Sequence, residues 1–220
     1  MKGILFDMDG TLLDSMEVWI HLANRYLDSM GLDKPENLQE EIKTMTLKEA
    51  LAHFKTIYRL DDSVEEMLVA THRILADAYK NTVVKKPQVD AVLQRLKSRG
   101  HRMAVSTATT DELSRPALSH HKLSGYFDFL QTVHNTGISK NDPAYWLEGA
   151  KRMQMPPENI VVFEDALHAI ESAKAAGMRV IAIEDAAMKR DREKIRATAD
   201  VYLRGFDAFD IAMLEDDYAK

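Results

Sequence analysis

The sequence contains no cysteine and few of the residues that interrupt regular structure. Without cysteine, a disulfide framework, a thiolate zinc site, an iron–sulfur cluster and a cysteine nucleophile are all excluded. The absence also fits a reducing compartment such as the cytosol. The 220 residues include 9 glycines and 6 prolines, about 7% of the chain against about 12% in average proteins. This scarcity predicts long helices rather than many tight turns.

Long apolar runs are also missing. A membrane-spanning helix needs about 20 apolar residues, and no run approaches that length. The N-terminal apolar stretch ends at Asp7, so it does not have the form of a signal peptide. The net charge of −6 gives no electrostatic reason to expect nucleic-acid binding. We therefore expect a soluble cytoplasmic protein with no nucleic-acid or membrane partner, and we expect a monomer.

Short apolar runs, each bounded by polar residues as buried parallel strands are, recur at wide intervals. They lie at Gly3–Phe6, Met103–Val105, Phe129–Val133, Ile160–Phe163 and Val180–Ile183. Between them, apolar residues recur with helical spacing, for example from Ala166 to Ala176, after which Gly177 ends the pattern. The alternation predicts an α/β fold with a Rossmann-like, doubly wound parallel sheet.

One long interval, from about Ser15 to Val84, has helical patterns and no convincing strand pattern. Its length of about 70 residues far exceeds the dozen or so that a crossover between parallel strands needs. We interpret residues 15–84 as an inserted all-helical domain, which leaves residues 1–14 and 85–220 as the α/β core domain. A chain of 220 residues has room for one domain with such an insert.

Two carboxylates and a glycine directly follow the first predicted strand, in the segment Asp7-Met8-Asp9-Gly10-Thr11. In open α/β sheets, ligands bind outside the carboxyl ends of the strands, so Asp7 and Asp9 are expected in the crevice there. The alternative is a simple turn, because Asp-Gly is a common turn dipeptide. An EF-hand is excluded, because the glycine follows the second aspartate at once and no glutamate stands at the twelfth position.

A second acidic pair, Glu164-Asp165, directly follows the predicted strand Ile160–Phe163. By itself, Asp165 could be the N-cap of the helix that follows. Beside the first acidic pair, another interpretation is favoured, because carboxylates at neighbouring strand ends repel each other unless a cation neutralises them. Oxygen ligands without histidine or cysteine suit Mg2+. The two pairs together therefore predict a magnesium site.

Hydroxyls and a lysine complete the candidate chemistry. Ser106 and Thr107 follow the second predicted strand, where a hydroxyl caps a helix or binds a ligand oxygen. Ser114 and Pro116 have the better form of a cap and first-turn pair, which leaves Ser106 for a ligand. A lone lysine such as Lys140 is usually a solvated surface residue, but near carboxylates and an anion it is the expected counter-charge. These groups together are what phosphoryl transfer requires.

Over nearly its whole length, the chain resembles the haloacid dehalogenase (HAD) superfamily, in the branch that contains β-phosphoglucomutases and small-molecule phosphatases. The four motifs of that family match in order at Asp7-Met8-Asp9-Gly10-Thr11, Ser106, Lys140 and Glu164-Asp165. The resemblance implies that Asp7 attacks phosphorus and becomes an aspartyl-phosphate. It implies that Asp9 protonates the leaving oxygen and then takes a proton from the attacking water. The inserted helices would be the family's helical cap, which closes over small substrates.

The resemblance also implies the remaining roles. Ser106 and Lys140 would hold phosphoryl oxygens, and Lys140 would also orient the nucleophile. Mg2+ would bind the side chain of Asp7, the backbone carbonyl of Asp9 and the side chain of Asp165. Glu164 would bind the ion directly or through water. The second acid favours phosphate esters over haloacids as substrates, because a halide leaving group needs no proton.

Two departures argue against mutase activity. The β-phosphoglucomutases carry a histidine ten positions after the second aspartate, where this chain has Trp19. His21 lies two residues on, about 200° around a helix, and is a poor substitute. At the position where those mutases carry an arginine this chain has Leu47, and Lys43 or Lys48 either replaces that arginine or is a solvated helix charge.

We therefore predict a Mg2+-dependent phosphatase that hydrolyses a small, sugar-phosphate-like metabolite through an aspartyl-phosphate. A phosphomutase of the same fold is the first alternative, and a non-catalytic phospho-ligand binding protein is the second. The candidates for substrate contact are Thr107, Trp19, His21 and Lys43. For Trp19, ordinary packing in the helical domain is the alternative.

Overall fold

The computed structural model describes residues 1–35, 37–38, 42, 45 and 47–215. Its internal contacts divide the chain into two compact units. The α/β unit comprises Met1–Met16 and Val83–Lys220, and the helical unit comprises Glu17–Thr82. The chain therefore leaves the α/β unit shortly after its first strand and returns to it 66 residues later.

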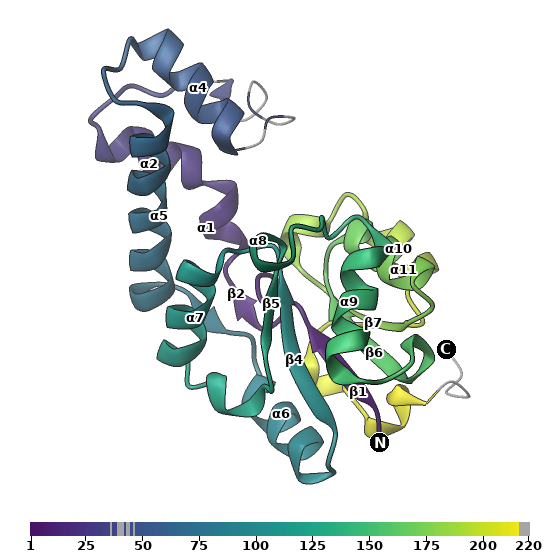
Figure 1. Cartoon of the computed structure of the whole chain (residues 1–220). Coiled ribbons are helices and arrows are strands. Elements are labelled where there is room, and N and C mark those ends of the chain that lie inside the picture. The colour runs from purple at the N-terminus through teal and green to yellow at the C-terminus, as the bar shows by residue number, and fades with distance from the viewer. Residues whose placement is uncertain (36, 39–41, 43–44, 46, 216–220) are drawn as a thin grey trace. The chain divides into compact units, whose positions relative to one another are not determined.

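A parallel sheet of six strands is the framework of the described part of the α/β unit (Figure 1). Its order is β5-β4-β1-β6-β7-β8, and every neighbouring pair is parallel. The strands are β1 (Gly3–Phe6), β4 (Arg102–Thr107), β5 (Leu130–Thr132), β6 (Ile160–Glu164), β7 (Arg179–Ile183) and β8 (Val201–Leu203). The first strand lies in the interior of the sheet, and the chain builds outward from it in both directions. The sequence-based prediction of a doubly wound parallel sheet is confirmed.

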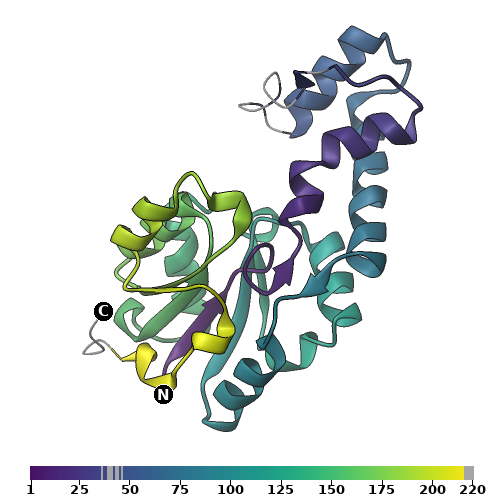
Figure 2. The ribbon, with the colours of Figure 1, turned by 180° about the vertical axis from the view of Figure 1, so that it is seen from behind.

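Helices cover both faces of this sheet, as the two opposite views show (Figures 1 and 2). On one side lie α9 (Pro143–Met153), α10 (Leu167–Ala175) and α11 (Arg192–Thr198). On the other side lie α6 (Val89–Ser98) and α7 (Asp111–His120). A short helix, α8 (Val133–Thr136), directly follows β5, and β2 (Leu13–Asp14) pairs antiparallel with β3 (Val84–Lys85).

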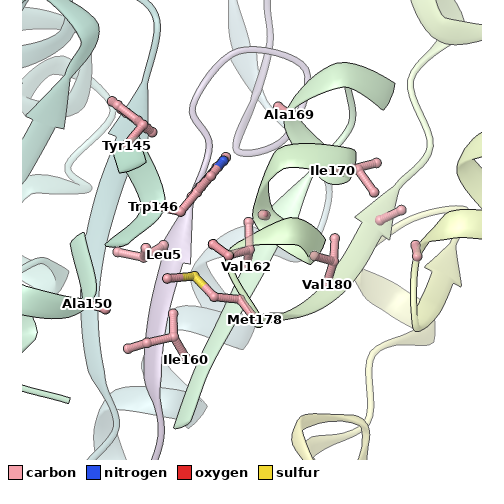
Figure 3. Close-up of a cluster of buried hydrophobic side chains, with 14 of the residues drawn as sticks. Leu5, Tyr145, Trp146, Ala150, Ile160, Val162, Ala169, Ile170, Met178 and Val180 are labelled. Atoms are coloured by element: carbon pink, nitrogen blue, oxygen red, sulfur yellow. The ribbon is translucent and has the colours of Figure 1, made fainter. Parts of the chain in front are cut away.

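The core under α9 and α10 is built from alternate residues of the strands (Figure 3). Leu5, Val162 and Val180 point toward Trp146 and Ile170 and are fully buried. Since side chains of a strand alternate between its two faces, Phe6 and Phe163 point the other way. There the two rings stack at 4.6 Å. With both faces buried, the strands read as the continuous apolar runs seen in the sequence.

The helical unit contains the described helices α1 (Met16–Ile20, which begins at the boundary), α2 (Leu22–Ser29), α4 (Leu47–Tyr58) and α5 (Val64–Asn81). Tyr26, Phe54 and Met67 are buried in its own apolar core. At the start of α5, Ser63 and Glu66 form a reciprocal capping box, which satisfies two of the amide groups left unpaired at a helix N-terminus. The regular secondary structure of the described residues 17–82 is thus helical, as the periodicity of this interval predicts.

Several sequence-based boundaries are corrected by the structure. Strand β8 was missed, because a three-residue strand at an edge carries little periodicity. The interval predicted to lack strands, from about Ser15 to Val84, ends one residue too late, because strand β3 begins at Val84. Ser114 and Pro116 do not start a helix: α7 begins at Asp111 after Thr110, and both residues lie inside it. No helix of the described ranges combines the length and the apolar character needed to cross a membrane.

The ion pair between Lys174 and Asp200 generates a stability prediction. Lys174 donates to both carboxylate oxygens of Asp200, at 2.8 and 2.7 Å, and the Val180 amide donates to one of them. Burial opposes the charge, but these donors outweigh it and lower the pKa of Asp200. A lowered pKa stabilises the fold above the unfolded pKa of about 3.9, and that stabilisation is lost as the pH falls through the folded pKa.

Asp200→Asn should therefore lower the melting temperature by about 2 °C at pH 7, since the pair is partly exposed and contributes no more than about 1 kcal/mol. The difference from wild type should shrink as the pH falls from 4 toward 3. Thermal melts across this range test the prediction, with Asp207→Asn at an exposed position as the control. An equal deficit at pH 3 and pH 7 would contradict it.

Candidate active site

Asp7 is the first residue after β1 and is nearly fully buried, with 4% of its surface exposed. Its amide donates to the Phe163 carbonyl at 2.9 Å, so it continues the pairing of β1 with β6. Asp7 lies two residues after Leu5, so its side chain points to the same sheet face, the one that α9 covers. The carboxylate of Asp7 therefore lies at the carboxyl end of β1, buried between the sheet and the helices on that face.

Three buried carboxylates meet at this end of the sheet. Asp7, Glu164 and Asp165 each offer an oxygen within 4.8 Å of those of the other two. Burial and the charges of Glu164 and Asp9 outweigh the lowering effect of Lys140 and raise the pKa of Asp7 well above its ordinary value. Burial and the charges of Glu164 and Asp7 raise the pKa of Asp165 in the same way. The cluster is therefore strained electrostatically by its own negative charge.

Lys140 supplies the positive charge inside the cluster. Its ammonium donates to Asp7 Oδ1 at 2.5 Å and to Glu164 Oε2 at 2.6 Å, and the side chain is buried. Burial works against the charge, but Asp7 and Glu164 outweigh it and raise the pKa of Lys140 above its ordinary value. The ammonium therefore stays protonated at neutral pH. It is a true counter-charge rather than a solvated surface lysine.

Two residues of neighbouring helices position Lys140. The ring of Trp146 in α9 lies 5.3 Å from the ammonium. The indole N–H of Trp146 donates to Ser172 Oγ in α10 at 2.7 Å, and this hydroxyl donates to the Lys140 carbonyl at 2.6 Å. Both ends of the lysine are thus held by buried contacts. Neither helix residue was singled out from the sequence, because neither carries chemistry of its own.

The loop after Asp7 turns tightly against Asp165. Gly10 has a φ of +84°, and a Cβ atom there would lie 2.4 Å from Asp165 Oδ2. Only glycine fits both the backbone conformation and this close approach. Thr11 Oγ1 donates to Asp165 Oδ1 at 3.1 Å. The glycine is therefore required by the site and is more than a turn residue.

Asp9 lies beside the cluster, with its carboxylate held by two hydroxyls. Ser15 Oγ donates to Asp9 Oδ1 at 2.6 Å, and Thr109 Oγ1 donates to Asp9 Oδ2 at 2.7 Å. The side chain of Asp9 is not in the group of close carboxylates among the described residues, and the metal role of its backbone carbonyl stays a prediction. Ser15 and Thr109 were missed from the sequence, because isolated hydroxyl residues carry no signal of what they contact.

Ser106 and Thr107 end β4 and are buried. Ser106 Oγ has no hydrogen-bond partner among the described residues, which leaves a buried donor for a ligand. Thr107 Oγ1 accepts from the Thr109 amide at 3.1 Å, so it shapes the turn that delivers Thr109. The hydroxyl of Tyr145 reaches the carbonyls of Thr107 and Gln131 and joins the ends of β4 and β5.

A magnesium ion fits the residues present. The donors are hard oxygens, as Mg2+ prefers. Asp165 Oδ2 is buried and has no hydrogen-bond partner within the described residues. A divalent cation at that oxygen would also relieve the repulsion that raises the pKa of Asp7 and Asp165. The alternative role of Asp165 as a helix cap is excluded, because α10 starts with Ala166 at its N-cap and no side-chain cap bond.

The candidate substrate contacts in the inserted segment lie in the helical unit. Trp19 is half-buried, and its indole N–H donates to the Tyr79 hydroxyl at 3.2 Å. His21 pairs with Glu17 at 3.2 Å along the same turn. Lys48 forms an exposed ion pair with Glu65 at 3.2 Å, as a solvated helix charge does. Lys43 lies outside the described residues.

Comparison with known proteins places this geometry in a family. The model of the haloacid dehalogenase-like hydrolases matches residues 4–183. The chain is 28% identical to a phosphorylated carbohydrates phosphatase of Thermotoga maritima, covering 82% of this chain and 84% of that protein. It is 31% identical to the fructose-1-phosphate phosphatase YqaB of Escherichia coli, covering 81% and 94%.

A solved structure has a similar fold. The structure of CbbY from Rhodobacter sphaeroides superposes with a TM-score of 0.79 at 24% identity, covering 98% of this chain and 99% of that one. The motifs, the sheet and the family model define one class of enzyme. The chain belongs to the haloacid dehalogenase-like hydrolases. The resemblance seen in the sequence is thereby confirmed.

The close approach of Gly10 to Asp165 generates a prediction. Gly10→Ala should cost about 2–4 kcal/mol of unfolding free energy, because a Cβ both strains the backbone and meets a carboxylate. Gly100→Ala is a matched control, since φ is +76° there and no described atom lies within 4 Å. It should cost only the conformational strain, about 1 kcal/mol. Urea unfolding measures both, and equal losses would show that the contact with Asp165 is unimportant.

Proposed function

We propose that the protein is a Mg2+-dependent phosphatase that hydrolyses a small, sugar-phosphate-like metabolite through an aspartyl-phosphate. The observation that carries the proposal is the buried cluster of Asp7, Glu164 and Asp165 with Lys140 inserted into it. An unpartnered buried hydroxyl at Ser106, judged against the described residues, supports it. Relatives named as phosphatases of phosphorylated carbohydrates and of fructose 1-phosphate support the substrate class.

In this proposal Asp7, Glu164, Asp165 and the Asp9 carbonyl would hold Mg2+. The ion would supply positive charge beside the carboxylates and the phosphoryl oxygens. Lys140 and Ser106 would donate to those oxygens, which gain charge during transfer. Lys140 already contacts Asp7 Oδ1, so it also fixes the orientation of the nucleophile.

Two displacements at phosphorus follow. A carboxylate oxygen of Asp7 forms a bond to phosphorus while the bond to the ester oxygen breaks, and Asp9, which enters this step protonated, donates that proton to the leaving alcohol. Asp9, now ionised, takes a proton from a water whose oxygen attacks the aspartyl-phosphate. The phosphorus–Asp7 bond breaks, phosphate leaves, and both aspartates return to their first state.

We propose that the helical unit is the cap of this enzyme and contributes the contacts that choose the substrate. Trp19, His21 and Lys43 are the proposed contacts there, and Thr107 is the proposed contact in the α/β unit. The mutase alternative has less support. Trp19 occupies the place of the mutase histidine, and its indole N–H donates a hydrogen bond but neither gives up nor accepts a proton. Conversion of β-glucose 1-phosphate to glucose 6-phosphate without phosphate release would favour the mutase.

The nucleophile is tested by Asp7→Asn, which keeps the shape of the side chain and removes its charge. Hydrolysis of p-nitrophenyl phosphate with added Mg2+ should fall at least about 1000-fold, because a neutral amide is a poor nucleophile. Glu171→Gln, at an exposed position of α10, is the control and should keep the wild-type rate. A wild-type enzyme that turns over no phosphate ester with Mg2+, or an Asp7→Asn enzyme that retains a tenth of the rate, would refute the proposal.

The hydroxyls around Asp9 generate a separate prediction. Thr109→Val removes the bond to Asp9 Oδ2 and keeps the side-chain volume, while Thr109→Ser keeps the bond. If Asp9 must be held to transfer protons, Thr109→Val should lower kcat about 10-fold with little change in KM. Thr109→Ser should restore most of the rate. Equal kinetics for the two variants would show that this bond does not position the acid.

A further inference from the structure

A second buried ion pair lies next to the carboxylate cluster and plays no part in the chemistry described above. Lys86 Nζ donates to Asp185 Oδ2 at 2.8 Å and to the Glu184 carbonyl at 2.9 Å. The two side chains are only 12% and 4% exposed. The other oxygen of Asp185 accepts from the Ala187 amide at 2.8 Å. Lys86 is therefore a neutralising partner of a carboxylate that water scarcely reaches.

The main chain brings this pair to the edge of the sheet where the active site lies. Asp185 comes two residues after the end of β7, the neighbour of β6, and Glu164 of β6 is in register with Ala182 of β7. Asp185 is among the charges that raise the pKa of Asp165. From the other side, the Lys86 amide donates to the Leu12 carbonyl at 3.0 Å, in the loop that begins at Asp7.

The charge balance of this edge depends on the pair. Without Lys86, Asp185 would add a further negative charge to a site that already buries three carboxylates. Without Asp185, Lys86 would add an uncompensated positive charge. Charges inside a protein act over several ångströms with little screening. Either change therefore alters the electrostatic energy of a cation bound by the cluster.

We propose that the Lys86–Asp185 pair sets the affinity of the Asp7–Glu164–Asp165 cluster for a divalent cation, with Lys86 cancelling the attraction that Asp185 would otherwise exert on it. The proposal rests on the Mg2+ site of the proposed function and adds residues beyond the four motifs. Lys86 and Asp185 act through the field at the metal and do not touch it. A purely structural pair would behave differently, because breaking it from either side would disturb the site in the same direction.

The test is the Mg2+ affinity of the substrate-free protein, measured by calorimetric titration with magnesium chloride. Lys86→Met should bind Mg2+ about 3- to 10-fold more tightly, and Asp185→Asn should bind it more weakly by a similar factor. The double variant Lys86→Met/Asp185→Asn should return close to wild type. Lys85→Met is the matched control, since Lys85 forms a more exposed ion pair with Asp90. The Mg2+ affinity of this variant should equal that of wild type.

The outcomes separate this inference from the proposed function. A wild-type protein that binds no Mg2+ refutes the metal site itself. If wild type binds but both single variants weaken binding or leave it unchanged, the proposal for Lys86 and Asp185 is overturned. If Lys86→Met does not fold, the comparison of Asp185→Asn with the double variant decides. The proposal requires weaker binding in the first and recovery in the second, and it fails otherwise.

Discussion

The mutual repulsion of three buried carboxylates is the constraint on which the rest of the structure depends. Asp7, Glu164 and Asp165 lie at the ends of the adjacent strands β1 and β6, where parallel pairing gives them no freedom to separate. Burying like charges is costly unless opposite charge is buried with them. Much of the surrounding architecture is therefore an arrangement of positive charge and hydrogen-bond donors around this point.

Lys140 meets part of that requirement, and the contacts that hold it extend through two helices. The Trp146 ring and the Ser172 hydroxyl belong to α9 and α10, the helices whose apolar residues also form the main core. The same two helices thus form the apolar core and hold Lys140 in the active site. The remaining negative charge, together with the unpartnered oxygen of Asp165 within the described residues, makes the site suited to a divalent cation.

The sequence was informative where chemistry and periodicity coincide. Short apolar runs followed at once by Asp7 or Glu164 indicated both a buried parallel strand and the side of the sheet that binds ligand. The same reasoning missed Ser15, Thr109, Ser172 and the pair of Lys86 with Asp185. Each acts through a contact with a distant residue, and a hydroxyl or a lysine at one position does not reveal its partner. Boundaries failed for a related reason, since nothing local distinguished Thr110 from Ser114 as the start of α7.

The central claim is that this cluster makes Asp7 a phosphoryl acceptor. The most direct measurement is to quench the enzyme with acid during turnover of a phosphate ester, reduce it with borohydride, and map the modified residue by mass spectrometry. Reduction converts an aspartyl-phosphate to homoserine, and the account predicts this change at Asp7 alone, dependent on both substrate and Mg2+. Modification at another residue, or none under conditions of full turnover, would contradict the account.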